Sequence, residues 1–155
     1  QLMPKFQTLI SISIYFVMVV SCKNETKKEA DESFQNTLKI HLDAVKNRDI
    51  EQLIPTISDN VILISPNGKI LESKDSFVQM HRNWFTTRNW TWEPRLLKSY
   101  SNDSLGYAMV EYVYTETDSL DQISYSSKNL LSLIFKLSEN NQWELILDQN
   151  TTTKD

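Results

Sequence analysis

Apolar positions in the first half of the chain follow a helical period. From Glu32 they recur every three or four residues, which predicts an amphipathic helix with one apolar stripe: Phe34, Leu38, His41, Leu42 and Val45. Asp49 then precedes a short apolar stretch limited by Pro55, so we predict a second, short helix with Asp49 as its N-cap. Ser73 caps a predicted third helix, whose wide apolar face is Phe77, Met80, His81, Trp84 and Phe85.

The remaining segments are β-branched or alternate between apolar and polar residues, as strands do. Residues 61–65 and 69–72 flank the turn sequence Pro66-Asn67-Gly68, so they predict a hairpin. Longer strands are predicted over residues 90–100, 105–117 and 124–137, and Pro94 restricts the first of them to a sheet edge or a bulge. A final strand begins at Trp143. The odd-numbered residues are the expected core face of the last two strands: Leu131, Leu133, Phe135, Leu137, Trp143, Leu145 and Leu147.

The order of these elements predicts an α+β fold. Two helices, a hairpin and a third helix precede a long antiparallel meander, so the helices gather on one side of the sheet. We expect a cone-shaped, strongly curved antiparallel sheet wrapped around three N-terminal helices. A sheet bent in this way leaves an internal pocket at its open end.

The N-terminal segment predicts an export signal. Lys5 precedes an apolar run over residues 9–20, which is too short to cross a bilayer, since crossing takes about 20 residues. The run ends in Val19-Val20-Ser21-Cys22, which resembles the lipobox of bacterial lipoproteins. The alternative is a buried helix that ends in an ordinary cysteine. Cys22 is the chain's single cysteine, so it has no internal disulfide partner.

The lipobox resemblance implies a division of the chain and a location. We expect a signal peptide over 1–21, a lipidated Cys22 with a polar tether over 22–31, one domain over 32–151 and a short tail over 152–155. The lipid on Cys22 would be the anchor to the membrane. In lipoproteins an Asp after the cysteine is the usual inner-membrane retention signal, and Lys23 stands here. We therefore expect the bacterial cell envelope, at the outer membrane, on its periplasmic or surface side.

Composition argues against several classes of function. The formal net charge is −4 and no basic cluster occurs, so we expect no nucleic-acid partner. Gly68 and Gly106 are the only glycines, which excludes a glycine-rich phosphate loop. His41 and His81 are the only histidines and lack a metal-ligand spacing, so we expect no metal and no cofactor.

The order of motifs resembles the nuclear transport factor 2-like superfamily, in its SnoaL-like and ketosteroid-isomerase-like branch. The residues that carry the resemblance are the stretches 44–53 and 57–61, the turn 66–68 and the terminal 143–151. The resemblance implies a cone with an internal pocket. Members include isomerases, cyclases, dehydratases and non-catalytic binding or assembly modules, so the fold does not fix the function.

The ketosteroid isomerase chemistry of that branch does not carry over. It needs a carboxylate base at the end of the first strand, where this chain has Ser65, which cannot take a proton from carbon near neutral pH. The tyrosine position on the first helix holds His41, which can still donate a hydrogen bond. The second donor position falls near Leu133, which has no polar group. Ketosteroid isomerase activity is therefore not expected.

Six residues are candidates for the pocket, each with a plainer alternative. His41 lies on the apolar stripe and either serves a ligand or is a core histidine with a hydrogen-bond partner. The others are His81, Trp84 and Tyr107 at the pocket mouth, Glu111 within an apolar strand, and Gln149 at the end of the last strand. The aromatic and histidine candidates can equally be plain core, Glu111 a solvated or interface acid, and Gln149 a partner for an exposed backbone edge. The odd-numbered core face selects Gln149 over Asp148 as the inward residue.

Two hypotheses about function remain, together with one about assembly. The first is a non-catalytic module that binds a small apolar or amphipathic ligand or a protein partner. The second is a lyase, isomerase or hydrolase that uses His41 as acid or base, with Tyr107 or Gln149. We also expect a homodimer through the convex face of the sheet, to which we assign an apolar strand face that helices or a partner must cover: Gly106, Ala108, Val110, Tyr112 and Tyr114.

Overall fold

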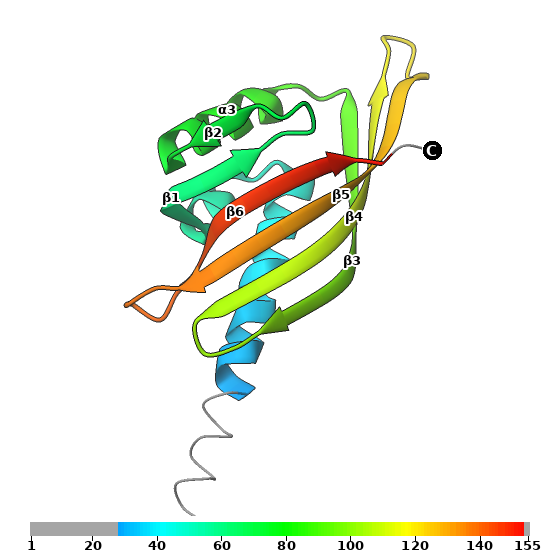
Figure 1. Ribbon diagram of the computed structural model, residues 1–155. Coiled ribbons are helices and arrows are strands. Elements are labelled where there is room, and N and C mark those ends of the chain that lie inside the picture. The colour runs from blue at the N-terminus through cyan, green and yellow to red at the C-terminus, as the bar shows by residue number, and fades with distance from the viewer. Residues whose placement is uncertain (1–27, 154–155) are drawn as a thin grey trace, which may run out of the picture.

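The structure, a computed structural model, describes residues 28–153 and contains three helices and a six-stranded sheet (Figure 1). The first helix covers residues 28–47 of the described part. It is followed by α2 (Ile50–Leu53), a 3-10 turn η1 (Ile54–Thr56) and, after the first hairpin, α3 (Lys74–Thr86). The strands are β1 (Ile57–Ile64), β2 (Ile70–Glu72), β3 (Trp90–Ser101), β4 (Leu105–Thr117), β5 (Ile123–Leu137) and β6 (Trp143–Thr152).

The strands lie in the order β2-β1-β6-β5-β4-β3, and the sheet is open. The predicted α+β class is confirmed. Every neighbouring pair is antiparallel except β1 and β6, which run parallel, so the expectation of a wholly antiparallel sheet is wrong at this pair. Parallel strands need a long connection. Here α3 and the β3–β5 meander separate β1 from β6, so the chain can enter β6 in the direction of β1.

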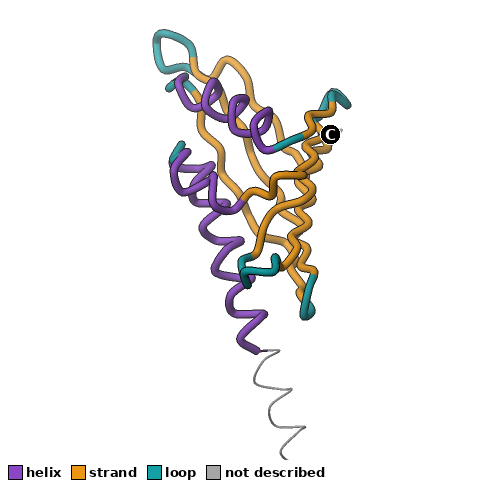
Figure 2. The backbone as a smooth tube through the Cα atoms, turned by 90° about the vertical axis from the view of Figure 1, so that its left-hand side faces the viewer, coloured by secondary structure: helices purple, strands orange, loops and turns teal. Residues whose placement is uncertain are grey.

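Helices and sheet form two layers. The sheet curves around the helices, all of which lie on its concave side (Figure 2). Phe34 of the first helix packs edge-on against Phe135 of β5 and Trp143 of β6, with ring centroids 5.8 and 5.2 Å apart. A Cβ atom on Gly106 of β4 would lie 2.5 Å from the Phe34 ring. The absence of a side chain at Gly106 therefore lets the first helix approach the sheet.

Local sequence explains where the elements begin and turn. The Asp49 carboxylate accepts a hydrogen bond of 3.0 Å from the backbone N–H of Gln52, and Ser73 caps α3 through its hydroxyl, so both predicted N-caps are confirmed. Gly68 has φ +81° in the turn between β1 and β2, which a side chain would strain. Pro94 lies in β3, an edge strand, where a residue without a backbone N–H is tolerated, as the sequence predicts.

The boundary of the domain differs from the expected one. Residues 28–31, assigned above to a tether, already belong to the first helix. Asp31 is held there because its carboxylate accepts a hydrogen bond of 2.7 Å from the Ser101 hydroxyl at the end of β3. Cys22 and the predicted signal peptide lie outside the described residues. Within residues 28–153, no helix has the length and apolar character needed to cross a membrane.

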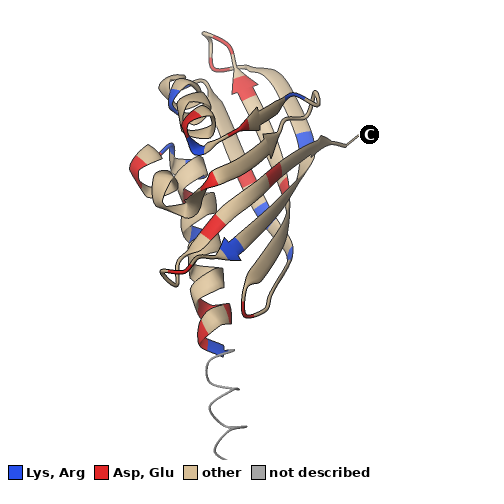
Figure 3. Ribbon diagram, turned by 60° about the vertical axis from the view of Figure 1, so that its left-hand side comes forward, with Lys and Arg blue, Asp and Glu red and all other residues tan. Residues whose placement is uncertain are grey.

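The two faces of β4 are the reverse of the assignment made for the dimer. Gly106, Ala108, Val110 and Tyr112 are buried on the concave face, where helices and the cavity cover them. That assignment is therefore wrong. The convex face instead carries exposed apolar residues from β3 and β4: Tyr100, Leu105, Tyr107, Met109 and Val113. Charged residues of both signs are interspersed over helices and strands (Figure 3).

Candidate functional site

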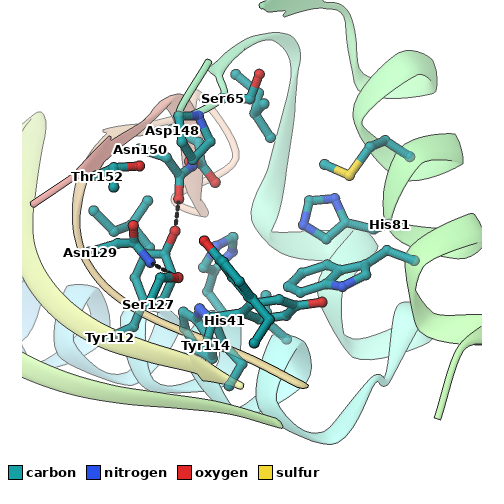
Figure 4. A pocket seen from close by; sticks show the side chains of 18 residues that line it. His41, Ser65, His81, Tyr112, Tyr114, Ser127, Asn129, Asp148, Asn150 and Thr152 are labelled. Carbon is teal, nitrogen blue, oxygen red and sulfur yellow. Dashed lines mark hydrogen bonds between the residues drawn. The ribbon is translucent and has the colours of Figure 1, made fainter. Parts of the chain in front are cut away.

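A cavity of about 510 Å³ opens between the concave face of the sheet and the helices. Its volume lies within the range of about 300–1,000 Å³ that is usual for small-molecule sites. The walls are largely apolar or aromatic: Val45, Leu63, Pro66, Met80, Trp84, Trp92, Tyr112, Tyr114, Tyr125 and Leu131. The polar lining residues are His41, Ser65, His81, Ser127, Asn129, Asp148, Asn150 and Thr152 (Figure 4).

Asp148 reaches this cavity because β6 contains a bulge. Leu147 pairs with Ile134 of β5, but Leu145 pairs with Phe135, so Ile146 is an extra residue in β6. One extra residue inverts the alternation of faces that follows it. Leu145 is therefore buried before the bulge, and Asp148 is buried after it.

The bulge also decides the outcome for Gln149. The prediction that Gln149 points inward is wrong. It assumes that inward and outward residues alternate strictly along β6, and the bulge, which the sequence does not reveal, breaks that alternation. Gln149 is exposed, and Asp148 and Asn150 line the cavity instead. Asp148 is the functional candidate that sequence reasoning missed. Asn129 could have been found, since it shares the odd-numbered face of Leu131 and is buried as that pattern predicts.

The Asp148 carboxyl group belongs to a short hydrogen-bonded chain. Asn150 donates from Nδ2 to Asp148 Oδ1 over 2.7 Å, and the Tyr112 hydroxyl donates to Asn150 Oδ1 over 2.9 Å. Burial raises the pKa of Asp148 to about 7, against a smaller lowering by the Asn150 bond. Protonated and ionised forms of Asp148 are therefore both populated near neutral pH.

His41 lies where the sequence predicted, on the stripe of the first helix and in the cavity wall. Its Nδ1 is 2.9 Å from the Thr56 hydroxyl oxygen, and that hydroxyl donates its own proton to the Leu53 carbonyl over 2.7 Å. Thr56 can then only accept from His41, so Nδ1 carries the proton and Nε2 keeps a lone pair. Burial, and then the charge of His81, lower the pKa of His41 to about 3, so the ring is neutral near pH 7.

His81 of α3 has the same tautomer for a different reason. Its Nδ1 lies 2.9 Å from the backbone carbonyl of Phe77, which can only accept, so Nδ1 donates and Nε2 keeps a lone pair. The ring stacks on Phe77 with centroids 4.2 Å apart. Burial lowers the pKa of His81 to about 4. The cavity wall thus contains two neutral imidazoles, each with an unprotonated Nε2.

The predicted candidate Trp84 lines the cavity, within an aromatic cluster. Its ring stacks on Trp90 at 4.3 Å and 15°. The guanidinium carbon of Arg48 lies 3.9 Å from the centroid of Trp90. Tyr114 completes this wall, with its ring 6.1 Å from that of Trp84. Arg48 is thus close to Trp90, which does not line the cavity.

Two other candidates lie outside the cavity. Tyr107 was expected at the pocket mouth but is on the convex face, where its ring is 6.0 Å from that of Tyr100, because odd-numbered residues of β4 point outward. Glu111 shares this face and pairs with Arg95 and Lys128, each at 2.8 Å. These pairs and their hydrogen bonds lower the pKa of the Glu111 carboxyl. Glu111 is therefore a surface acid on the convex face, which was the predicted alternative to a pocket acid.

Two positions that the isomerase resemblance assigns to catalysis lie in or beside the cavity. Ser65 lines the cavity, and Leu133 is fully buried beside Asp148, with which it pairs in the ladder between β5 and β6. A cavity carboxyl group is thus present, but on the last strand. Residues 28–153 contain no group of three or more His, Cys, Asp or Glu side chains that could hold a metal ion.

The chain matches no protein-family model and no curated protein. Solved structures do resemble it. A nuclear transport factor 2-like protein of unknown function from Pseudomonas putida gives a TM-score of 0.69 at 14% identity, with 83% of this chain and 89% of that chain covered. A ketosteroid isomerase-like protein from Erwinia carotovora atroseptica gives 0.66 at 13%, with 80% and 96% covered.

A third similar structure is the CaMKII association domain of C. elegans, with a TM-score of 0.61 at 12% identity and coverage of 83% of this chain and 99% of that one. At these identities the likeness concerns the fold. The helices on the concave side of a curved open sheet, the cavity between them and these structural neighbours agree: the chain has the nuclear transport factor 2-like fold.

Proposed function

We propose that this domain binds a small amphipathic ligand in the cavity. The observation that carries the proposal is a convergence of polar groups within an otherwise apolar and aromatic cavity. The Asp148 carboxyl group and the imidazoles of His41 and His81 all line it. An apolar wall supplies affinity, and a few placed polar groups orient the ligand.

The binding test uses a pair of neighbouring serines. Ser127 lines the cavity, whereas Ser126 is exposed and pairs with Thr115 through side chains on the other face of β5. Nile red, a neutral dye that brightens in apolar surroundings, should bind the unmodified chain and Ser126→Trp. Ser127→Trp should fill the cavity and remove the signal. Equal dye binding by the two variants would place the binding elsewhere.

A second candidate function is general acid–base catalysis, and one observation favours it. A buried carboxyl group with a pKa of about 7 is suited to proton transfer near neutral pH. Asp148 is then a better candidate for the acid or base than His41, because the lowered pKa of His41 makes its imidazole a weak base.

The catalytic candidate can be tested without knowing the substrate. 5-Nitrobenzisoxazole opens when any positioned base removes its carbon-bound proton. Catalysis by Asp148 should rise with pH around a midpoint near 7 and disappear in Asp148→Asn. A rate no higher than that of free acetate at equal concentration would leave binding as the function.

We also propose that the domain is anchored at the bacterial outer membrane by lipid on Cys22. The support is the residue pattern that ends in Val19-Val20-Ser21-Cys22 and is followed by Lys23. Diacylation would meet the requirement for two membrane-binding signals that a single chain does not satisfy. Cys22→Ser should leave an unlipidated precursor of different mass. Unchanged mass and membrane fractionation would contradict the anchor.

Finally, we propose a homodimer through the convex face of the sheet. The support is the exposed apolar set around Tyr107 and Met109, which lies on neighbouring strands β3 and β4. Contiguous exposed apolar surface of this kind is typical of protein interfaces. The CaMKII association domain, which has a similar fold, is named for association and is compatible with such a role.

A further inference from the structure

We propose that the ligand of this cavity is an organic ammonium ion that bears N–H donors on an apolar or aromatic body. The inference rests on the proposed binding function and names the chemical class that the same cavity selects. Three independent features of the lining support it: its charge, its aromatic walls and its hydrogen-bonding sense.

The charge of the lining has one sign. Of the described residues that line the cavity, Asp148 is the only acid, and none is a lysine or arginine. The side-chain partner of Asp148 is Asn150, a neutral amide, so the ionised carboxylate has no counter-ion in the cavity. A buried charge without an opposite charge is unfavourable. A bound cation would supply the missing charge, whereas an anion would meet repulsion.

The aromatic walls suit a cation for a second reason. Five aromatic side chains line the cavity: Trp84, Trp92, Tyr112, Tyr114 and Tyr125. The face of an aromatic ring attracts a cation, most strongly when water is excluded, and the Arg48–Trp90 contact beside the cavity is one such pair. The Tyr114 hydroxyl also donates to the Glu116 carboxylate over 2.7 Å. Glu116 and Arg48 thus border the aromatic wall with charges of opposite sign, and neither lines the cavity.

The hydrogen-bonding sense of the site selects N–H groups. In both His41 and His81 the Nδ1 proton is already used, by Thr56 and by the Phe77 carbonyl. Each Nε2 is therefore an acceptor, and the Asp148 carboxylate accepts as well. The histidines and Asp148 lie around one cavity in Figure 4. An ammonium group with several N–H donors satisfies more of these acceptors than an alcohol or a quaternary ammonium ion does.

The proposal also predicts a pH dependence with a defined sign. The other titratable groups in the lining are His41 from the first helix, His81 from α3, Tyr112 and Tyr114 from β4, and Tyr125 from β5. Both histidine pKa values lie at about 4 or below, so these rings stay neutral above pH 5.5. Asp148 must lose its proton to pair with the cation. Because its pKa is about 7, affinity should weaken about thirtyfold between pH 8 and pH 5.5.

Four probes with one phenyl body separate these features by calorimetry on the full chain. They are 2-phenylethylammonium, its N-trimethyl derivative, neutral 2-phenylethanol and anionic 3-phenylpropanoate. At pH 8 we expect the primary ammonium ion to bind at least about tenfold more tightly than the alcohol. We expect the quaternary ion to fall between them and the anion to bind weakest. Asp148→Asn should reduce the preference for the ammonium ion over the alcohol to less than about threefold, and Glu111→Gln, on the convex face, should leave it unchanged.

Equal or tighter binding of the alcohol would overturn the cation class while leaving a ligand-binding cavity in place. A preference for the ammonium ion that survives in Asp148→Asn, or that does not weaken at pH 5.5, would overturn it as well. So would the failure of the ammonium ion to bind at millimolar concentration. In that case the proposed binding function is decided separately by Nile red and the paired serine variants.

Discussion

The titration of buried Asp148 should make a separable contribution to the pH dependence of stability. Burial raises the pKa of Asp148 from 3.8 to about 7. The folded state then holds this proton more tightly than the unfolded state, so the contribution of Asp148 to the free energy of unfolding falls as pH rises from about 4 through 7. A pKa difference of one unit corresponds to about 1.4 kcal/mol, so the ionised carboxylate should destabilise the fold by about 4 kcal/mol above pH 7.

The two buried histidines act in the opposite direction. The pKa values of His41 and His81 are lowered to about 3 and about 4, so the fold loses stability as pH falls below their ordinary value of 6.5. The stability curve of the unmodified protein therefore mixes both effects. Comparison with Asp148→Asn isolates the carboxyl group, because the histidines are common to both proteins. The new amide keeps an oxygen that can accept from Asn150.

Urea unfolding between pH 4 and pH 8, followed by tryptophan fluorescence, measures the difference. The stability of Asp148→Asn relative to the unmodified protein should rise by about 4 kcal/mol across this range, with most of the change between pH 5 and pH 7. Asp59→Asn is the matched control, since the Asp59 side chain is 90% exposed and its difference should stay constant. A difference for Asp148→Asn that varies by less than about 1 kcal/mol would refute the burial of the Asp148 carboxyl group.

Three further substitutions test the packing, the site and the assembly. Gly106→Ala should destabilise the fold by about 1–3 kcal/mol in urea unfolding, because its Cβ would meet the Phe34 ring. Phe34→Leu should relieve part of that loss, and additive losses in the double variant would contradict the close approach. His41→Phe should lower stability by only about 1 kcal/mol, since the Thr56 hydroxyl keeps its bond to the Leu53 carbonyl, and it should weaken the binding of 2-phenylethylammonium in calorimetry. Lost stability with unchanged affinity would instead make His41 a purely structural core residue. Tyr107→Glu should convert the proposed dimer to a monomer in sedimentation velocity at micromolar concentration, and a monomeric unmodified protein would contradict the dimer.

Much of the fold follows from local patterns in the sequence. The stripe through Phe34, Leu38 and His41 fixed the buried side of the first helix, because residues three and four apart share one helical face. The caps at Asp49 and Ser73 depend only on side chains that reach nearby backbone N–H groups. Such features involve neighbours in the sequence, so they could be predicted without knowledge of the tertiary structure.

The identity of the site residues depended on pairing between distant strands. Alternation along β6 predicts Gln149 on the inner face, but the bulge at Ile146 forms only when β6 pairs with β5, and it turns Asp148 inward instead. The face of β4 that carries Tyr107 was likewise decided by where the helices pack. The raised pKa of Asp148 comes from burial among residues of several elements. The sequence by itself determined the elements, the α+β class and the place of His41. Only the tertiary structure decided which side of the strands faces the cavity, because register and burial are set by contacts between segments far apart in the chain.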